Sequence, residues 1–140
     1  MYSGQYAIAN PDRPAFIMAG SGIAVSYAEF EARSNKLAHF LRDQGLGFQD
    51  HYAIFMENNE RYMESCSAGE RAGLYYTCIN SYLTGDELAY IVNNSESKVL
   101  ITSKAKIDVV ADALSSCPNI EVVLVTDAAD TDLPQLMTDY

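Results

Sequence analysis

Basic residues are scarce in this chain, and none lies near its end. Nine Lys and Arg residues stand against 19 Asp and Glu residues, which gives a formal net charge of −10 over 140 residues. No Lys or Arg follows Lys106, whereas seven carboxylates lie from Asp108 to Asp139. Nucleic acids and anionic membrane surfaces would repel such a chain, so the charge argues against both as partners. We interpret the acidic run as a solvated surface.

Long apolar runs and targeting signals are also missing. No stretch approaches the roughly 18 consecutive apolar residues of a membrane-spanning helix, and no basic region followed by an apolar run opens the chain. We therefore expect no transmembrane segment and no signal peptide. The three cysteines, Cys66, Cys78 and Cys117, show no C-x-x-C spacing, which favours buried apolar thiols and a reducing, cytoplasmic location.

No complete catalytic constellation is found. His39 and His51 have no partner motif, and no spacing suggests a His–Asp–Ser arrangement. The pair Asp86–Glu87 falls at a predicted helix start, and Asp130 and Asp132 fall in a predicted loop. These positions favour helix capping and solvation over acid–base catalysis or a calcium site. The residues alone therefore predict no catalytic, cofactor-binding or metal-binding residue.

What the sequence does contain is regular alternation of β-prone and helical segments. Its hydrophobic fraction of 49% is enough for a sizeable core, and its length suits one domain or a piece of a larger one. Residues Met1–Asn10 lack a clear period and are expected to run along the surface. Gly20–Gly22 separates two β-prone runs, which predicts a hairpin. A phosphate-binding loop is disfavoured, because a helix would have to follow it directly.

Polar start signals mark the helices. The capping boxes Ser26-x-x-Glu29 and Thr84-x-x-Glu87 each predict a helix start, and Gly45 predicts the end of the first helix. The second box precedes an apolar stripe that consists of Leu88, Ile91 and Val92.

Two further helices are expected. Asn58 and Asn59 can cap a less regular helix, in which Met63 and Cys66 supply apolar surface. Gly69 lies inside that helix and is expected to weaken it by roughly 1 kcal/mol relative to alanine. Ser103 is expected to cap the other helix, whose predicted apolar stripe consists of Ile107, Val110, Ala111 and Leu114.

Four apolar runs predict strands that are covered on both faces, as in parallel sheets. They are His51–Met56, Tyr75–Ile79, Lys98–Thr102 and Ile120–Thr126. Together with the helices, they predict an α/β three-layer sandwich with a mainly parallel sheet and an N-terminal β-hairpin. We expect residues 1–140 to form a single α/β domain, with a linker or loop over residues 127–140.

Several segments follow a shared pattern in the same order along the chain. They are Arg13–Ala15, Val25–Phe30, Ser34–Leu41, Gly45–Gly47, Ala53–Asn58, Arg71–Tyr76, Ile79–Ile91 and Ser97–Ile101. Together they resemble the beginning of the adenylate-forming enzymes, and specifically of the acyl-CoA synthetases. Tyr-Tyr-x-x-Ile-Asn and Leu-Thr-x-x-Glu-Leu, within residues 75–88, are most similar to the fatty-acyl-CoA ligase branch.

This resemblance implies an ATP-dependent reaction of a carboxylic acid, a fatty acid in that branch, with coenzyme A. Acyl-CoA, AMP and pyrophosphate are its products, and ATP, Mg²⁺ and coenzyme A are the cofactors of the parent enzyme. The family's Gly-x-Pro-Lys and Tyr-Gly-x-Thr-Glu motifs lie later in its chain. None of the four lysines here (Lys36, Lys98, Lys104 and Lys106) follows Gly-x-Pro. No catalytic, cofactor-binding or metal-binding residue can therefore be transferred, and the fragment is expected to be inactive and to bind no cofactor.

The same resemblance implies a partial domain of the large adenylation domain. Its partners would be the remainder of the parent polypeptide and, through apolar surface left uncovered, other copies of the chain. Two alternatives stay open. One is a free-standing flavodoxin-like or Rossmann-like module that binds a small ligand or a protein. The other is a short homologue that acts by association with full-length subunits.

Overall fold

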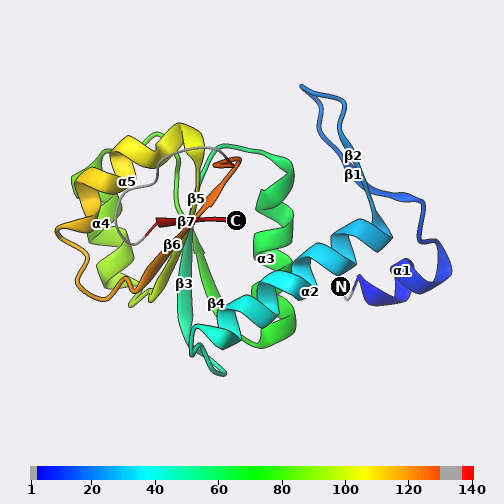
Figure 1. Ribbon diagram of the computed structural model, residues 1–140, viewed down its shortest axis with the longest axis horizontal. Coiled ribbons are helices and arrows are strands. Elements are labelled where there is room, and N and C mark those ends of the chain that lie inside the picture. The colour runs from blue at the N-terminus through cyan, green and yellow to red at the C-terminus, as the bar shows by residue number, and fades with distance from the viewer. Residues whose placement is uncertain (1–2, 130–136) are drawn as a thin grey trace.

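A computed structural model of the chain describes residues 3–129 and 137–140 (Figure 1). A five-stranded sheet forms its middle layer, in the order β4-β3-β5-β6-β7, and every neighbouring pair of strands is parallel. The strands are β3 (His51–Phe55), β4 (Tyr75–Cys78), β5 (Val99–Ser103), β6 (Val122–Thr126) and β7 (Met137–Asp139). The predicted mainly parallel sheet is thus confirmed.

Helices cover both faces of this sheet. The helices α2 (Tyr27–Asp43) and α3 (Glu60–Ala72) lie on one face, and α4 (Gly85–Asn94) and α5 (Ile107–Leu114) lie on the other (Figure 1). Tyr52 and Ile54 of β3 pack into the core beneath α2 and α3. Ala53 and Phe55, which alternate with them, pack into the core beneath α4 and α5. The three-layer α/β sandwich is therefore confirmed.

The strand order explains why the helices divide between the faces. The chain passes from β3 through α3 to β4 on one side, and then returns through α4 to β5 on the other side of β3. Because parallel crossovers are right-handed, connections that run in opposite directions along a sheet place their helices on opposite faces. The chain reverses direction between β3 and β5.

The N-terminal unit lies apart from the sheet (Figure 1). The strands β1 (Pro14–Ile17) and β2 (Ala24–Ser26) form the predicted antiparallel hairpin. The segment before it, which was expected only to run along the surface, is mostly exposed and contains a short helix, α1 (Gly4–Ala9). Stacking of Tyr6 on Tyr27, with ring centroids 5.3 Å apart, joins this helix to the start of α2.

The predicted helix starts are largely confirmed. Ser26 and Thr84 each accept a hydrogen bond from the backbone N–H of the glutamate three residues on, and each glutamate reaches back to its cap. Asn59 caps α3 through the N–H of Arg61. Ser103 is the exception. A 3₁₀ turn, η1 (Lys104–Lys106), follows it and its side chain caps no helix.

Several expectations about burial are wrong. The run that begins at Tyr75 was expected to be a buried strand, yet β4 is the edge of the sheet, where Tyr75 and Cys78 are exposed. Met63 is exposed on α3 rather than part of its apolar face. In α5 the buried stripe uses Ala113, and Ala111 is exposed. Composition and periodicity indicate which segments are apolar, but the burial of each side chain depends on the position of its strand or helix in the fold.

The last segment differs in part from the expected loop. Met137–Asp139 form β7, which pairs with β6. The expected loop therefore does not hold for these residues, while residues 130–136 lie outside the described part of the chain.

Gly69 provides a direct test of the packing. A methyl group there would lie 2.5 Å from the hydroxyl oxygen of Tyr52 and 2.8 Å from Cδ1 of Tyr76. We therefore expect Gly69→Ala to lower the free energy of unfolding by about 1–3 kcal/mol through overpacking, despite the better helix propensity of alanine. Gly20→Ala is the matched control, because nothing lies within 4 Å of that position. Urea unfolding of both variants measures the difference, and a stabilised Gly69→Ala variant would contradict this packing.

Candidate functional site

The carboxyl ends of the strands are the first place to look for a ligand site. In open α/β sheets, ligands bind outside these ends where the strand order reverses, here between β3 and β5. At that point the Oγ atom of Ser103 donates a hydrogen bond to Oε2 of Glu57 at 2.5 Å. Thr102 Oγ1 donates to the carbonyl oxygen of Phe55 at 2.6 Å. The polar groups at the reversal point therefore bind one another.

Beside this point is a small crevice, which we call the carboxyl-end crevice. Its volume is about 270 Å³, and it is lined by Met56, Glu57, Asn58, Tyr62, Ile79, Asn80, Ser81 and Tyr82. These residues come from the segments after β3 and β4 and from the first turn of α3. The crevice presents two amides, a carboxylate and hydroxyl groups, which suits hydrogen bonding to a small polar group.

Tyr62 is the lining residue whose chemistry is most constrained. Burial, and secondarily the neighbouring Cys78 side chain, raise the pKa of Tyr62. The hydroxyl therefore stays protonated at neutral pH. Also in the lining, the Oδ1 atom of Asn80 accepts a hydrogen bond from the backbone N–H of Tyr82 at 3.1 Å. The crevice is thus held by local bonds and shows no nucleophile paired with a base.

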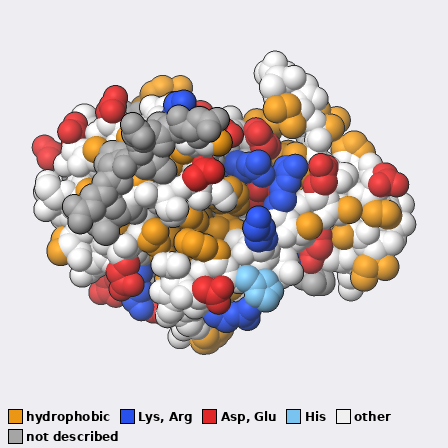
Figure 2. Space-filling model, in the orientation of Figure 1, with side chains coloured by type: hydrophobic (Ala, Val, Ile, Leu, Met, Phe, Trp, Pro, Cys, Tyr) orange, Lys and Arg blue, Asp and Glu red, His pale blue; other side chains and the backbone are white. Residues whose placement is uncertain are grey.

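A second cluster lies where α2, α3 and the end of the chain meet. Glu64 is fully buried, and its carboxylate binds Nη1 of Arg33 and Nη1 of Arg61, each at 3.2 Å. The hydroxyl of Tyr140 makes a longer hydrogen bond to Glu64, at 3.4 Å. We call these four residues the Glu64 cluster. Lys and Arg side chains gather there beside an apolar patch (Figure 2).

Arg61 is the residue of the Glu64 cluster whose charge is affected most clearly by its surroundings. Burial acts to lower the pKa of Arg61, but the charge and hydrogen bond of Glu64, with smaller contributions from Tyr140 and Glu60, raise that pKa overall. The guanidinium of Arg61 also lies 5.6 Å from the ring centroid of Tyr140. A cavity of about 340 Å³ adjoins the cluster, lined partly by Leu37, Phe40 and Leu124. Because Glu64 offsets the arginines, we assign this cluster to structure.

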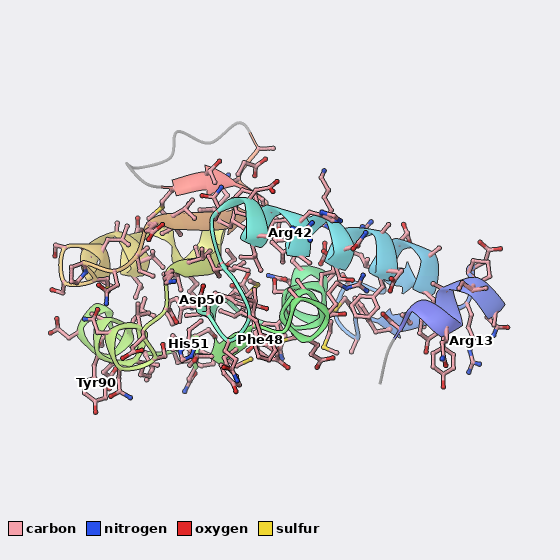
Figure 3. The ribbon with its side chains drawn as sticks, turned by 90° about the horizontal axis from the view of Figure 1, so that it is seen from below. Arg13, Arg42, Phe48, Asp50, His51 and Tyr90 are labelled. Carbon is pink, nitrogen blue, oxygen red and sulfur yellow. The ribbon has the colours of Figure 1, made fainter. Side chains whose placement is uncertain are left out.

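Both histidine rings contact polar groups of neighbouring residues. Nδ1 of His51 is 2.5 Å from the carbonyl oxygen of Ser95, and Nδ1 of His39 contacts the guanidinium of Arg42. His51 lies beside Asp50 and Phe48 at the amino end of β3 (Figure 3). A hydrogen bond from Lys98 lowers the pKa of Asp50, as does one from the backbone of Gly47.

The described residues do not fit an ATP–Mg²⁺ site. Among residues 3–129 and 137–140, no group of three or more His, Cys, Asp and Glu side chains could hold a metal ion. Lys98 is engaged by Asp50 at 2.7 Å, and the turn at Gly20–Gly22 leads into a strand instead of a helix N-terminus. Glu87 serves as a capping residue, and Asp130 and Asp132 lie outside the described residues.

Membrane insertion by a helix is likewise not indicated. Within the part of the chain that the structure describes, no helix has both the length and the apolar character needed to cross a membrane.

Comparison with known proteins gives a consistent match. A protein-family model described as AMP-binding enzyme matches residues 5–139. The 3-oxocholest-4-en-26-oate–CoA ligase of Rhodococcus rhodochrous is 36% identical over 123 residues, which cover 87% of this chain. A medium/long-chain-fatty-acid–CoA/3-oxocholest-4-en-26-oate–CoA ligase of Mycobacterium marinum is 32% identical over the same number of residues. The chain spans 22% of the length of each of these relatives.

Solved structures share the fold. A protein described as a long-chain-fatty-acid CoA ligase from Rhodopseudomonas palustris superposes with a TM-score of 0.84 at 24% identity, over 96% of this chain and 33% of that one. The acetoacetyl-CoA synthetase of Streptomyces lividans gives a TM-score of 0.87 at 20% identity, over 98% of this chain and 23% of that one. At such identities the likeness concerns the fold.

The Glu64 cluster yields a stability prediction. We expect Glu64→Gln to lower the free energy of unfolding by about 1–3 kcal/mol, because the two arginines lose the buried negative charge and one of its two acceptor oxygens. The loss should stay below that of a fully buried ion pair, since the Arg33 and Arg61 side chains are 35% and 28% exposed. Glu70→Gln, at an exposed position of the same helix, is the matched control. Equal denaturation midpoints for the two variants would contradict a structural role for the cluster.

Proposed function

Because the chain belongs to the AMP-binding enzyme family, we propose that it forms the N-terminal part of the adenylation domain of an ATP-dependent acyl-CoA synthetase. The parent joins a carboxylic acid to coenzyme A and converts ATP to AMP and pyrophosphate. The observation that carries this proposal is the family match over residues 5–139, together with relatives that are themselves CoA ligases.

The acid substrate of the parent is proposed to be apolar. Two relatives have names that specify a steroid-derived acid or medium- and long-chain fatty acids. Both classes carry a carboxylate on a large apolar body. Formation of an acyl-adenylate activates both kinds of acid in the same way, because AMP is a better leaving group than the carboxylate oxygen.

In the parent enzyme, this segment serves as a structural scaffold for the reaction. Among its described residues, no group of three or more His, Cys, Asp and Glu side chains could hold a metal ion. We propose that other parts of the parent bind ATP, Mg²⁺ and coenzyme A. The sheet and its two helical layers provide the rigid elements on which a precise site depends. We place the parent in the cytoplasm, supported by free thiols at all three cysteines.

A free-standing flavodoxin-like module is the alternative. The strand order β4-β3-β5-β6-β7 corresponds to the flavodoxin-like order. However, the bond between Ser103 and Glu57 spans the point where such folds bind their ligand. The geometry therefore favours a scaffold over an independent binding module.

The proposed function can be tested with a chimeric enzyme. This chain replaces the matching N-terminal segment of the Rhodococcus rhodochrous ligase, to which it is 36% identical. If the chain is a synthetase scaffold, the folded chimera should form acyl-CoA from 3-oxocholest-4-en-26-oate within about tenfold of the parent rate, a cost of about 1.4 kcal/mol. The ligase without this segment and the chain alone are the controls, and both should show background ATP–pyrophosphate exchange. A chimera with native thermal unfolding but no ligation, or turnover by the chain alone, would overturn the proposal.

We also propose that the isolated chain self-associates through apolar surface near the β4 edge. Phe48 and Tyr75 are 80% and 56% exposed, and β4 has a sheet neighbour on one side only among the described strands. The net charge of −10 opposes association, but salt screens it within roughly 10 Å at 0.1 M. Apolar burial contributes roughly 25 cal/mol per Å², so a few hundred Å² would outweigh the screened repulsion.

Sedimentation at micromolar concentration measures this association. We expect a dimer or larger species in high salt, and a shift toward monomer for Tyr75→Lys, because an edge lysine blocks strand pairing. Tyr90→Lys, at an exposed position of α4, adds the same charge away from the edge and should leave the association unchanged. A monomer at every salt concentration would refute the association.

A further inference from the structure

Two of the three cysteines, which the sequence presented as unrelated, lie together in the fold. Cys66 on α3 and Cys78 at the end of β4 have sulfur atoms 4.0 Å apart. Cys78 is exposed and Cys66 is half-buried. Cys117 is buried in the other core cluster, beneath α4 and α5.

We propose that Cys66 and Cys78 form a peroxide-sensitive dithiol, which oxidises to an intramolecular disulfide that joins α3 to the edge strand β4.

The geometry requires only a small movement. A disulfide has sulfur atoms about 2.05 Å apart, so the two sulfurs must approach by about 2 Å. Cys78 ends the edge strand β4 and is exposed. The α3–β4 connection between the cysteines is short, so the bond closes a local loop. Buried Cys117 has no such partner among the described residues.

The two thiols have different parts in the reaction. The thiolate of Cys78, the exposed sulfur, attacks an oxygen of hydrogen peroxide. The O–O bond breaks, a sulfenic acid forms, and the departing hydroxide takes up the proton that the Cys78 thiol released on ionising, which gives water. The sulfur of Cys66 then attacks the Cys78 sulfur, the S–O bond breaks, and the departing hydroxide takes the Cys66 proton as water. Two thiols are oxidised by two electrons in total, and one peroxide is reduced to two waters.

The environment of Cys66 is consistent with its role as the second thiol to react. Burial, and secondarily the neighbouring Cys78, raise the pKa of Cys66 to about 12. Cys66 therefore stays protonated and does not react with peroxide first. It acts only once a sulfenic acid forms beside it.

Thiol counting and peptide mapping test the proposal on the purified, reduced chain. After treatment with a few equivalents of hydrogen peroxide, we expect free thiols to fall from three to one. The mass should fall by about 2 Da, since two hydrogens are lost in forming a disulfide. Non-reducing peptide maps should link residue 66 to residue 78, and dithiothreitol should restore all thiols.

Single substitutions distinguish the roles of the three cysteines. Cys117→Ser should still form the bridge at an unchanged rate. Cys66→Ser should accumulate a dimedone-reactive sulfenic acid at Cys78 and should not show the mass loss that accompanies disulfide formation. Cys78→Ser should leave Cys66 reduced. Wild-type protein with Cys78 alkylated beforehand provides the same test without a substitution. Three free thiols after peroxide, a bridge that includes Cys117, or only intermolecular disulfides would overturn the proposal.

Discussion

The buried carboxylate of Glu64 is the constraint on which the α2–α3 layer depends. An unpaired carboxylate away from water costs several kcal/mol, so its partners must be in place when the layer closes. Those partners come from three parts of the chain: Arg33 on α2, Arg61 on α3, and Tyr140 after β7. A second ion pair also joins α3 to α2, since Arg71 donates two hydrogen bonds to the carboxylate of Glu31, at 2.6 and 3.0 Å. The ion pairs thus fix how α2 and α3 are aligned against each other. The apolar side chains beneath the two helices provide the buried surface.

Much of the fold was predictable from the sequence because its signals are local. The capping boxes at Ser26 and Thr84 and the apolar runs of the strands depend on residues within one or two turns, and the structure has them where expected. The rest depends on partners far away in sequence. An edge strand and a central strand share the same β-prone composition, so the position of β4 could not be deduced. Gly69 suggested only a weak helix, and its need for space comes from Tyr52 and Tyr76.

The candidate site was not predictable at all. The sequence indicated no site residue, because the carboxyl-end crevice is assembled from loops that only the strand order brings together. Ser103 resembled a helix cap, yet its hydroxyl binds Glu57 across the sheet. Cys66 and Cys78 show no spacing motif, and their proximity follows from the packing of α3 on β4. The family itself was predictable, and the match over residues 5–139 confirms it, because a pattern spread over many segments survives where single residues vary.

The position of Tyr140 has a consequence for synthesis on the ribosome. Domains form as the chain emerges, N-terminal parts first. When β6 has emerged, both helical layers and four strands of the sheet are present, but the hydroxyl that Tyr140 supplies to Glu64 is not. The nascent layer therefore holds its buried carboxylate with the two arginines alone. Completion of this layer coincides with the pairing of β7, so residues made late in this segment secure helices that were made about 70 to 110 residues earlier.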